Sequence, residues 1–192
     1  MEVSQKVGAR YIILHGWDDD PSAGWLGWLQ EQLRARGAEV YAPQFPAVRK
    51  REGIRPWQLA LDRLIAEILP GDVIIAHSLG CWQALRALEH CQIEGKVREV
   101  ILVAGFYDAP DERASAFFLP EPNWSILKAR VERWVCILSR DDTIVTPDRT
   151  RALASKLQAQ CVELDGFGHF LGSRGMQVFP ELLSLIDTLL KH

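Results

Sequence analysis

Short runs of apolar residues that alternate with amphipathic stretches most constrain the fold of this chain. Four runs are apolar almost throughout: residues 11–14 (YIIL), 73–76 (VIIA), 99–105 (EVILVAG) and 134–139 (WVCILS). A strand that is apolar on both faces must be covered on both faces, which is typical of parallel sheets packed between helices. With two weaker runs, residues 39–43 and 161–164, the pattern predicts an α/β fold with a mainly parallel six-stranded sheet, in a three-layer α/β/α arrangement.

The stretches between these runs predict the helices that cover the sheet. Apolar residues recur at helical spacing in residues 25–37, 55–69, 79–90, 147–158 and 178–192. Thr146 and Pro147 suit the cap and first turn of the fourth helix. The 192 residues suit a single domain. Its irregular part, residues 107–132, contains three prolines and is expected to form a small cap with a short helix after Asn123.

Charge and composition narrow the classes of function. The net charge of −3 does not suggest a nucleic-acid surface, and no apolar run is long enough for a signal peptide or a membrane span. The four cysteines are widely spaced and form no C-x-x-C pair. We therefore expect a cytoplasmic protein whose cysteines are reduced and buried, with neither a disulfide nor a zinc site.

The junction between residues 73–76 and the helix 79–90 contains a candidate nucleophile. It reads Ala76-His77-Ser78-Leu79-Gly80, one substitution away from G-x-S-x-G, the strand-to-helix turn that carries a nucleophilic serine. The residues two before and two after the serine must be small, because the strand and helix backbones approach each other there. Gly80 meets this need fully and Ala76 less so. Taken alone, the pentapeptide favours a plain turn, but its position between a buried strand and a helix makes a nucleophile about equally favoured.

A serine nucleophile needs a base, and the base needs an acid, each expected after a later strand. Asp141 and Asp142 follow residues 134–139, and His169 follows residues 161–164. Separately, the two aspartates are typical of a turn or a helix cap, and the histidine fits a surface loop as well as a catalytic site. Together, three required residue types stand in three expected places. The sequence therefore predicts a catalytic triad of Ser78, His169 and one of the two aspartates.

The first apolar run is followed by His15-Gly16-Trp17, where a second oxyanion donor is expected. Gly16 would let the backbone turn so that the N–H of Trp17 faces the N–H of Leu79, at the start of the helix 79–90. The alternative is a glycine turn with a tryptophan at an interface.

Other residues are candidates for a substrate pocket or a metal site. His15, Gly16 and Phe106 are candidate pocket residues. Residues 117–119 (FFL) could also line an acyl pocket, although core packing explains most of these apolar side chains better. The acidic cluster at residues 18–20 has no evident partner ligands, so a solvated loop rather than a metal site is expected.

The motifs resemble those of the α/β-hydrolase superfamily, specifically the small serine hydrolases typified by retinoblastoma-binding protein 9 and YdeN. The markers are HGW (15–17), AHSLGC (76–81), ILVAGF (101–106), SRDDTIV (139–145) and GFGHF (166–170), which together span nearly the whole chain. Alanine at the first position of AHSLG is typical of that group. The resemblance implies an α/β-hydrolase fold with Ser78 as nucleophile and His169 as base. Its Asp-x-x-Val spacing implies Asp142 as the acid, with Val145 as its partner and Asp141 as the fallback.

The resemblance implies esterase or peptidase activity on small acyl compounds, and such a mechanism needs no metal or organic cofactor. The expected partner is a small-molecule ester or amide, without nucleic acid or membrane. The alternative is a non-catalytic protein-interaction module on the same fold. That role would use a Leu-x-Cys-x-Glu segment, and residues 159–163 (AQCVE) lack the leucine. A complete triad favours the enzyme.

Overall fold

The computed structural model describes residues 9–17, 19–46, 55–109, 118 and 120–189. This part of the chain contains six strands: β1 (Arg10–Leu14), β2 (Glu39–Tyr41), β3 (Val73–His77), β4 (Val97–Val103), β5 (Val131–Ser139) and β6 (Gln160–Leu164). They form a single sheet in the order β2-β1-β3-β4-β5-β6, and every neighbouring pair is parallel. The predicted six-stranded sheet is therefore confirmed.

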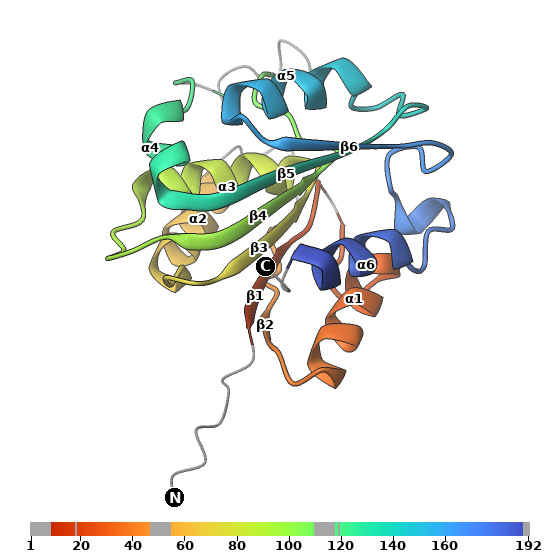
Figure 1. Cartoon of the computed structure of the whole chain (residues 1–192), viewed down its shortest axis with the longest axis horizontal. Coiled ribbons are helices and arrows are strands. Elements are labelled where there is room, and N and C mark those ends of the chain that lie inside the picture. Colours follow the sequence, from red (N-terminus) through yellow and green to blue (C-terminus); the bar gives the residue numbers. More distant parts are fainter. Residues whose placement is uncertain (1–8, 18, 47–54, 110–117, 119, 190–192) are drawn as a thin grey trace, which may run out of the picture.

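Helices cover both faces of this sheet (Figure 1). The described helices are α1 (Gly24–Ala35), α2 (Arg55–Glu67), α3 (Leu79–His90), α4 (Trp124–Arg130), α5 (Pro147–Leu157) and α6 (Pro180–Leu189). One apolar core lies between the sheet and α2 to α5, and a second lies between the sheet and α1 and α6. Alternate residues of one strand enter different cores: Ile12 and Leu14 pack in the first, and Tyr11 and Ile13 in the second. This double burial is the physical reason for the apolar runs in the sequence.

The strand order places the loops after β1 and β3 next to each other. The chain passes from β1 outward to β2, and then returns to β3 on the other side of β1. The register pairs Leu14 at the end of β1 with Ala76 near the end of β3. Parallel sheets bind ligands at such a reversal, beyond the carboxyl ends of the strands. The segments at 15–17 and 77–80 therefore meet where a site is expected.

Two helix starts were anticipated from the sequence, and they differ in how they are capped. The short helix predicted after Asn123 is α4, and the side chain of Asn123 accepts hydrogen bonds from the N–H groups of Ser125 and Ile126, both at 3.2 Å. Helix α5 begins at Pro147 as predicted. Thr146 stands at its N-cap position but makes no side-chain capping bond.

One of the four cysteines, at the edge of the sheet, is exposed, contrary to the expectation that all are buried. Cys81, Cys91 and Cys136 are buried, but Cys161 is exposed. Cys161 lies on β6, which has a neighbour on one side only within the described sheet, and Gln160 and Glu163 of the same strand are also exposed. The prediction was wrong for Cys161 because an apolar run does not reveal that its strand lies at an edge.

Other differences concern the boundaries of elements. Helix α2 ends at Glu67, and Leu69, expected on its apolar face, is 50% exposed. Of the cap expected at residues 107–132, residues 110–117 and 119 lie outside the described residues, while α4 and the start of β5 fall inside that range. The last three residues of the predicted C-terminal helix also lie outside the described part.

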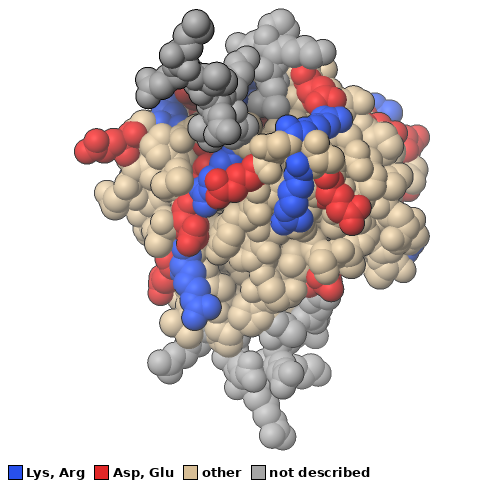
Figure 2. All heavy atoms as spheres, turned by 90° about the horizontal axis from the view of Figure 1, so that it is seen from below, with Lys and Arg blue, Asp and Glu red and all other residues tan. Residues whose placement is uncertain are grey.

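Ion pairs tie elements together at the end of the sheet away from the β1 and β3 loops. The guanidinium of Arg10 contacts Asp72 at 2.8 Å, Glu39 at 3.2 Å and Glu67 at 3.4 Å, which links β1, β2, α2 and the start of β3. On the face drawn in Figure 2, acidic and basic side chains lie beside one another. Within the described ranges, no helix has the length and apolar character needed to cross a membrane.

Candidate active site

Ser78 occupies a strained turn between β3 and α3. Its φ of 52° and ψ of −121° are unusual for a residue with a side chain. The N–H of Ser78 donates to the carbonyl of Val103 at 2.9 Å, which ties the turn to the end of β4. A Cβ on Gly80 would lie 2.6 Å from the carbonyl oxygen of His15 and 2.7 Å from that of Leu14. The small residue predicted at position 80 is therefore required by the backbone at the end of β1.

The side chains of Ser78, His169 and Asp142 form a continuous chain of hydrogen bonds. Ser78 Oγ lies 2.9 Å from His169 Nε2, and His169 Nδ1 lies 2.8 Å from Asp142 Oδ2. All three residues are at least nine-tenths buried, with exposed fractions of 8%, 6% and 5% respectively. Since a carboxylate only accepts, the ring carries its proton on Nδ1, and Nε2 accepts from the serine hydroxyl. This is the arrangement in which a serine can be deprotonated by the ring.

The geometry distinguishes between the two aspartates. The second oxygen of Asp142, Oδ1, accepts from the N–H groups of Ile144 at 2.8 Å and Val145 at 3.0 Å. The carboxylate is thus held by backbone donors on one side and by the His169 ring on the other. Val145 was expected as the partner of Asp142. Asp141 does not contact the ring, and its carboxylate bonds to Ser139 and to the loop before His169.

His77 bonds to the backbone of His169, and the two rings lie close together. Its Nε2–H donates to the carbonyl of His169 at 2.9 Å, and the two ring centroids are 5.1 Å apart. Burial, followed by the nearby His169, lowers the pKa of His77 to about 3, so its ring stays neutral. Sequence reasoning did not assign His77 this contact. The residue before the serine is not specified by G-x-S-x-G, and a bond to a backbone carbonyl has no sequence pattern.

His15 and Gly16 shape the loop after β1. The ring of His15 is buried: its Nε2 accepts from the N–H of Phe45 at 2.7 Å, and its Nδ1–H donates to the carbonyl of Gly16 at 2.7 Å. Burial lowers the pKa of His15, which also keeps this ring neutral. A Cβ on Gly16 would lie 3.1 Å from the Cβ of Ser78, so the loop backbone runs close beside the serine. The pocket role suggested for His15 stays a prediction.

Trp17 and Leu79 are the two residues whose N–H groups were predicted as oxyanion donors. Trp17 follows Gly16, and its side chain is 49% exposed. Leu79 is buried and is the first residue of α3, so its N–H has no partner within the helix. The helix dipole adds partial positive charge at the same point.

An aromatic group lies next to the strand that supports the serine turn. Phe106 is buried, with its ring centroid 5.4 Å from that of Phe118, and Phe118 packs on Trp82 at 4.8 Å. The guanidinium of Arg149 lies 4.9 Å from the ring centroid of Phe106. Phe117 and Leu119, the other pocket candidates, lie outside the described residues. Nowhere in the described segments are three or more His, Cys, Asp or Glu side chains grouped to hold a metal ion.

Comparison with protein families matches residues 11–188 to the family described as serine hydrolase. The chain belongs to the serine hydrolase family. The matched range contains Ser78, Asp142 and His169 and nearly all of the sheet. The family resemblance inferred from the motifs is therefore confirmed.

Two known proteins are similar to this chain along almost their full length. The chain is 29% identical over 185 residues to YdeN of Bacillus subtilis (strain 168), covering 93% of this chain and 95% of YdeN. It is 28% identical over 183 residues to the serine hydrolase RBBP9 of Rattus norvegicus, covering 92% of this chain and 91% of the relative.

Solved structures show the same fold. The crystal structure of the ydeN gene product from B. subtilis matches with a TM-score of 0.82 and 24% identity, covering 96% of this chain and 100% of that chain. A carboxylesterase from Nitrososphaera gargenis matches with a TM-score of 0.68 and 13% identity, covering 96% and 92%. The expected α/β-hydrolase fold is thereby confirmed.

Proposed function

We propose that this serine hydrolase cleaves a carboxylic ester or amide of a small substrate through an acyl-enzyme on Ser78. His169 is the general base and acid, and Asp142 holds the His169 ring in its working tautomer. The proposal rests above all on one observation, the continuous hydrogen-bond chain from Ser78 Oγ through His169 to Asp142. The strained backbone of Ser78 supports it, because such strain persists where it has a functional use.

In the first half of the reaction, Ser78 Oγ attacks the substrate carbonyl carbon while its proton moves to His169 Nε2. The protonated ring is stabilised by the Asp142 carboxylate on Nδ1. When the tetrahedral intermediate collapses, Nε2 gives its proton to the departing alcohol or amine, and the acyl group stays on Oγ. In the second half, a water loses a proton to Nε2 and attacks the acyl carbon. The bond between that carbon and Ser78 Oγ then breaks, and Nε2 returns its proton to Oγ. The products are a carboxylic acid and free Ser78.

The negative oxygen of the intermediate needs two donors, which we assign to the N–H groups of Leu79 and Trp17. The N–H of Leu79 is the first of α3 and adjoins the nucleophile. The carbonyl of Gly16 is held by the His15 ring, and in a trans peptide the next N–H points the opposite way. The His15 contact therefore fixes the direction of the Trp17 N–H. Loss of one such donor typically costs about 3 kcal/mol of transition-state stabilisation.

Esters are the first substrates to test. Hydrolysis of p-nitrophenyl acetate, butyrate and octanoate should follow saturation kinetics, and the dependence on chain length would give the size of the acyl pocket. Ser78→Ala and His169→Ala should each lower kcat/KM by about a thousandfold or more, because the nucleophile and base act as a unit.

Two exposed residues provide matched controls. Ser125→Ala on α4 and His90→Ala at the end of α3 remove the same side chains away from the site, and their rates should stay within twofold of wild type. Wild-type rates in Ser78→Ala would contradict the proposal.

A further inference from the structure

Each of residues 166–170, in the loop that presents His169, makes a hydrogen bond with another segment of the chain. The N–H groups of Gly166 and Gly168 donate to Asp141 Oδ1, both at 3.1 Å, and the N–H of Phe167 donates to Ser139 Oγ at 3.1 Å. After them, His77 bonds the carbonyl of His169. The indole N–H of Trp25 bonds the carbonyl of Phe170 at 2.8 Å. Three of these five tethers end on Ser139 and Asp141.

The Ser139–Asp141 pair forms a small clamp at the carboxyl end of β5. Ser139 is fully buried, and its hydroxyl donates to Asp141 Oδ1 while accepting from Phe167. Asp141 Oδ1 thus accepts from one hydroxyl and two backbone N–H groups. The Ser139 hydroxyl is the main cause that lowers the pKa of Asp141, which keeps its carboxylate ionised and its hydrogen bonds charge-assisted.

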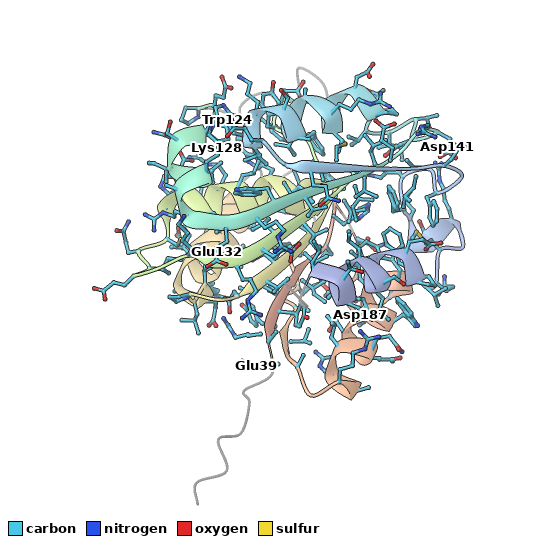
Figure 3. All side chains as sticks on the ribbon, viewed as in Figure 1. Glu39, Trp124, Lys128, Glu132, Asp141 and Asp187 are labelled. Carbon is cyan, nitrogen blue, oxygen red and sulfur yellow. The ribbon has the colours of Figure 1, made fainter. Side chains whose placement is uncertain are left out.

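The clamp and the acid of the triad belong to one turn. The N–H of Asp142 donates to the carbonyl of Ser139 at 3.1 Å, so residues 139–142 form a closed turn. From this turn, Asp142 reaches the His169 ring and Asp141 reaches the backbone before it. Figure 3 shows Asp141 at the far end of β5 from Glu132, beside the segment that follows β6. A single turn therefore bonds both to the ring and to the loop that carries it.

The loop itself has little intrinsic preference for this shape. Gly166, Gly168 and Phe170 all have positive φ, at 81°, 52° and 55°. Glycine has many alternative conformations, so external bonds must select the one that places the ring. A displacement of about 1 Å at a reacting group can cost a hundredfold in rate.

We propose that Asp141, together with Ser139, is a positioning residue that sets the location of the His169 imidazole through the backbone of residues 166–168. This inference rests on the proposed function for its kinetic consequences. It assigns Asp141 a role distinct from that of Asp142, although the two residues are adjacent and chemically identical.

The kinetic test compares Asp141→Ala, Asp141→Asn and Asp142→Asn. Asp141→Ala removes the acceptor and should lower kcat at least tenfold with KM within about twofold, because ring placement affects the transition state more than binding. Asp141→Asn keeps an oxygen at the same place and should recover kcat to within about threefold of wild type. Asp142→Asn disturbs the ring tautomer and should lose about 10³-fold to 10⁴-fold.

Asp148→Ala is the matched control, because it removes an exposed aspartate whose partner is Arg151 on α5. Its kcat should match wild type. A wild-type kcat in Asp141→Ala would overturn the proposal. So would a loss in Asp141→Asn as large as that in Asp142→Asn, because Asp141 would then act as the acid itself.

A spectroscopic measurement separates this proposal from the proposed function. The Nδ1 proton shared by His169 and Asp142 should give a downfield proton NMR signal in wild type, assigned by its absence in His169→Ala. This signal should broaden or shift in Asp141→Ala but not in Asp148→Ala. If the wild-type chain hydrolyses no ester but the signal behaves in this way, the proposed function fails and the positioning role stands. An identical signal in Asp141→Ala and wild type would overturn the positioning role.

Discussion

Ser78 and Gly80 illustrate how single residues create the turn at the centre of the site. The serine has positive φ, and two residues later the helix backbone passes the carbonyls of Leu14 and His15 at a distance that excludes a Cβ. Ala76, two residues before the serine, is fully buried in β3. The glycine at position 80 therefore reflects backbone contact between the end of β1 and α3.

The close approach at position 80 leads to a direct prediction. Gly80→Ala should lower the free energy of unfolding by about 3 kcal/mol and strongly reduce the proposed ester hydrolysis, because the contacts are with backbone atoms that cannot move aside. Urea unfolding and p-nitrophenyl ester assays would measure both effects.

Gly71→Ala is the comparison for this variant. Gly71 has a φ of 84°, and no atom lies within 4 Å of the position that the added methyl group would occupy. It should cost about 1 kcal/mol from backbone strain alone and leave activity unchanged. Equal destabilisation by the two substitutions would contradict the steric explanation.

Much of the candidate site could be anticipated residue by residue. Ser78, His169 and the pair Asp141 and Asp142 each follow a strand in a place specified by the connectivity of the sheet, and the family resemblance selected Asp142 from the pair. The contacts of His77 and Asp141 could not be anticipated, because both side chains bond to backbone atoms of a loop distant in sequence. A donor or acceptor in the main chain is present at every residue, so it leaves no pattern to read.

At the scale of elements, β3, β4 and β5 were predicted well because they are buried on both faces. The predictions for β6 were less complete, since Cys161 lies on an exposed edge. Which strand forms an edge depends on the spatial order of the strands, and that order is not a property of any single run.

Strand β4 also carries a buried carboxyl group, Glu99. Among the described residues its Oε1 has no hydrogen-bond partner, and burial raises its pKa to about 7, opposed by Arg133 and Arg98. Between the ordinary glutamate value of 4.5 and about 7, the folded chain therefore binds more protons here than the unfolded chain. The stabilising contribution is complete below pH 4.5 and is lost as the pH rises through 7.

Glu99→Gln should remove this dependence. The free energy of unfolding of wild type should fall relative to that of Glu99→Gln as the pH rises from 5 to 8, and the variant should be the more stable protein at pH 8. Urea unfolding at several pH values gives the comparison. A constant difference across this range would argue against a titrating Glu99.

At the scale of the molecule, segments from four parts of the chain converge beyond the carboxyl ends of the strands. Residues 15–17, 78–80, 141–145 and 166–170 each follow a strand of the parallel sheet. Their convergence follows from the connectivity, since the carboxyl ends of parallel strands all lie on the same side of the sheet. The two apolar cores pack against the strands from opposite faces of the sheet, which holds the segments that carry Ser78, Asp142 and His169 in place.

The burial of the cysteines predicts how the folded molecule reacts with thiol reagents. Cys161 is exposed, whereas Cys81, Cys91 and Cys136 are buried. Burial raises the pKa of all four thiols, so exposure alone distinguishes Cys161. A thiolate must reach the disulfide of Ellman's reagent to attack it, so the reagent should modify one thiol per native chain and four in guanidinium. Cys161→Ser should abolish the native reaction. More than one reactive thiol in the native chain would contradict the packing of the cores.

The central claim is that Ser78, activated by His169, is a nucleophile, and covalent labelling tests it most directly. The native chain would be treated with a fluorophosphonate, and the site of modification would be located by peptide mass spectrometry. We predict one adduct, on the peptide that contains Ser78, with no adduct in Ser78→Ala and greatly slowed labelling in His169→Ala. A folded wild-type chain that stays unlabelled, or an adduct at another residue that survives in Ser78→Ala, would contradict the account.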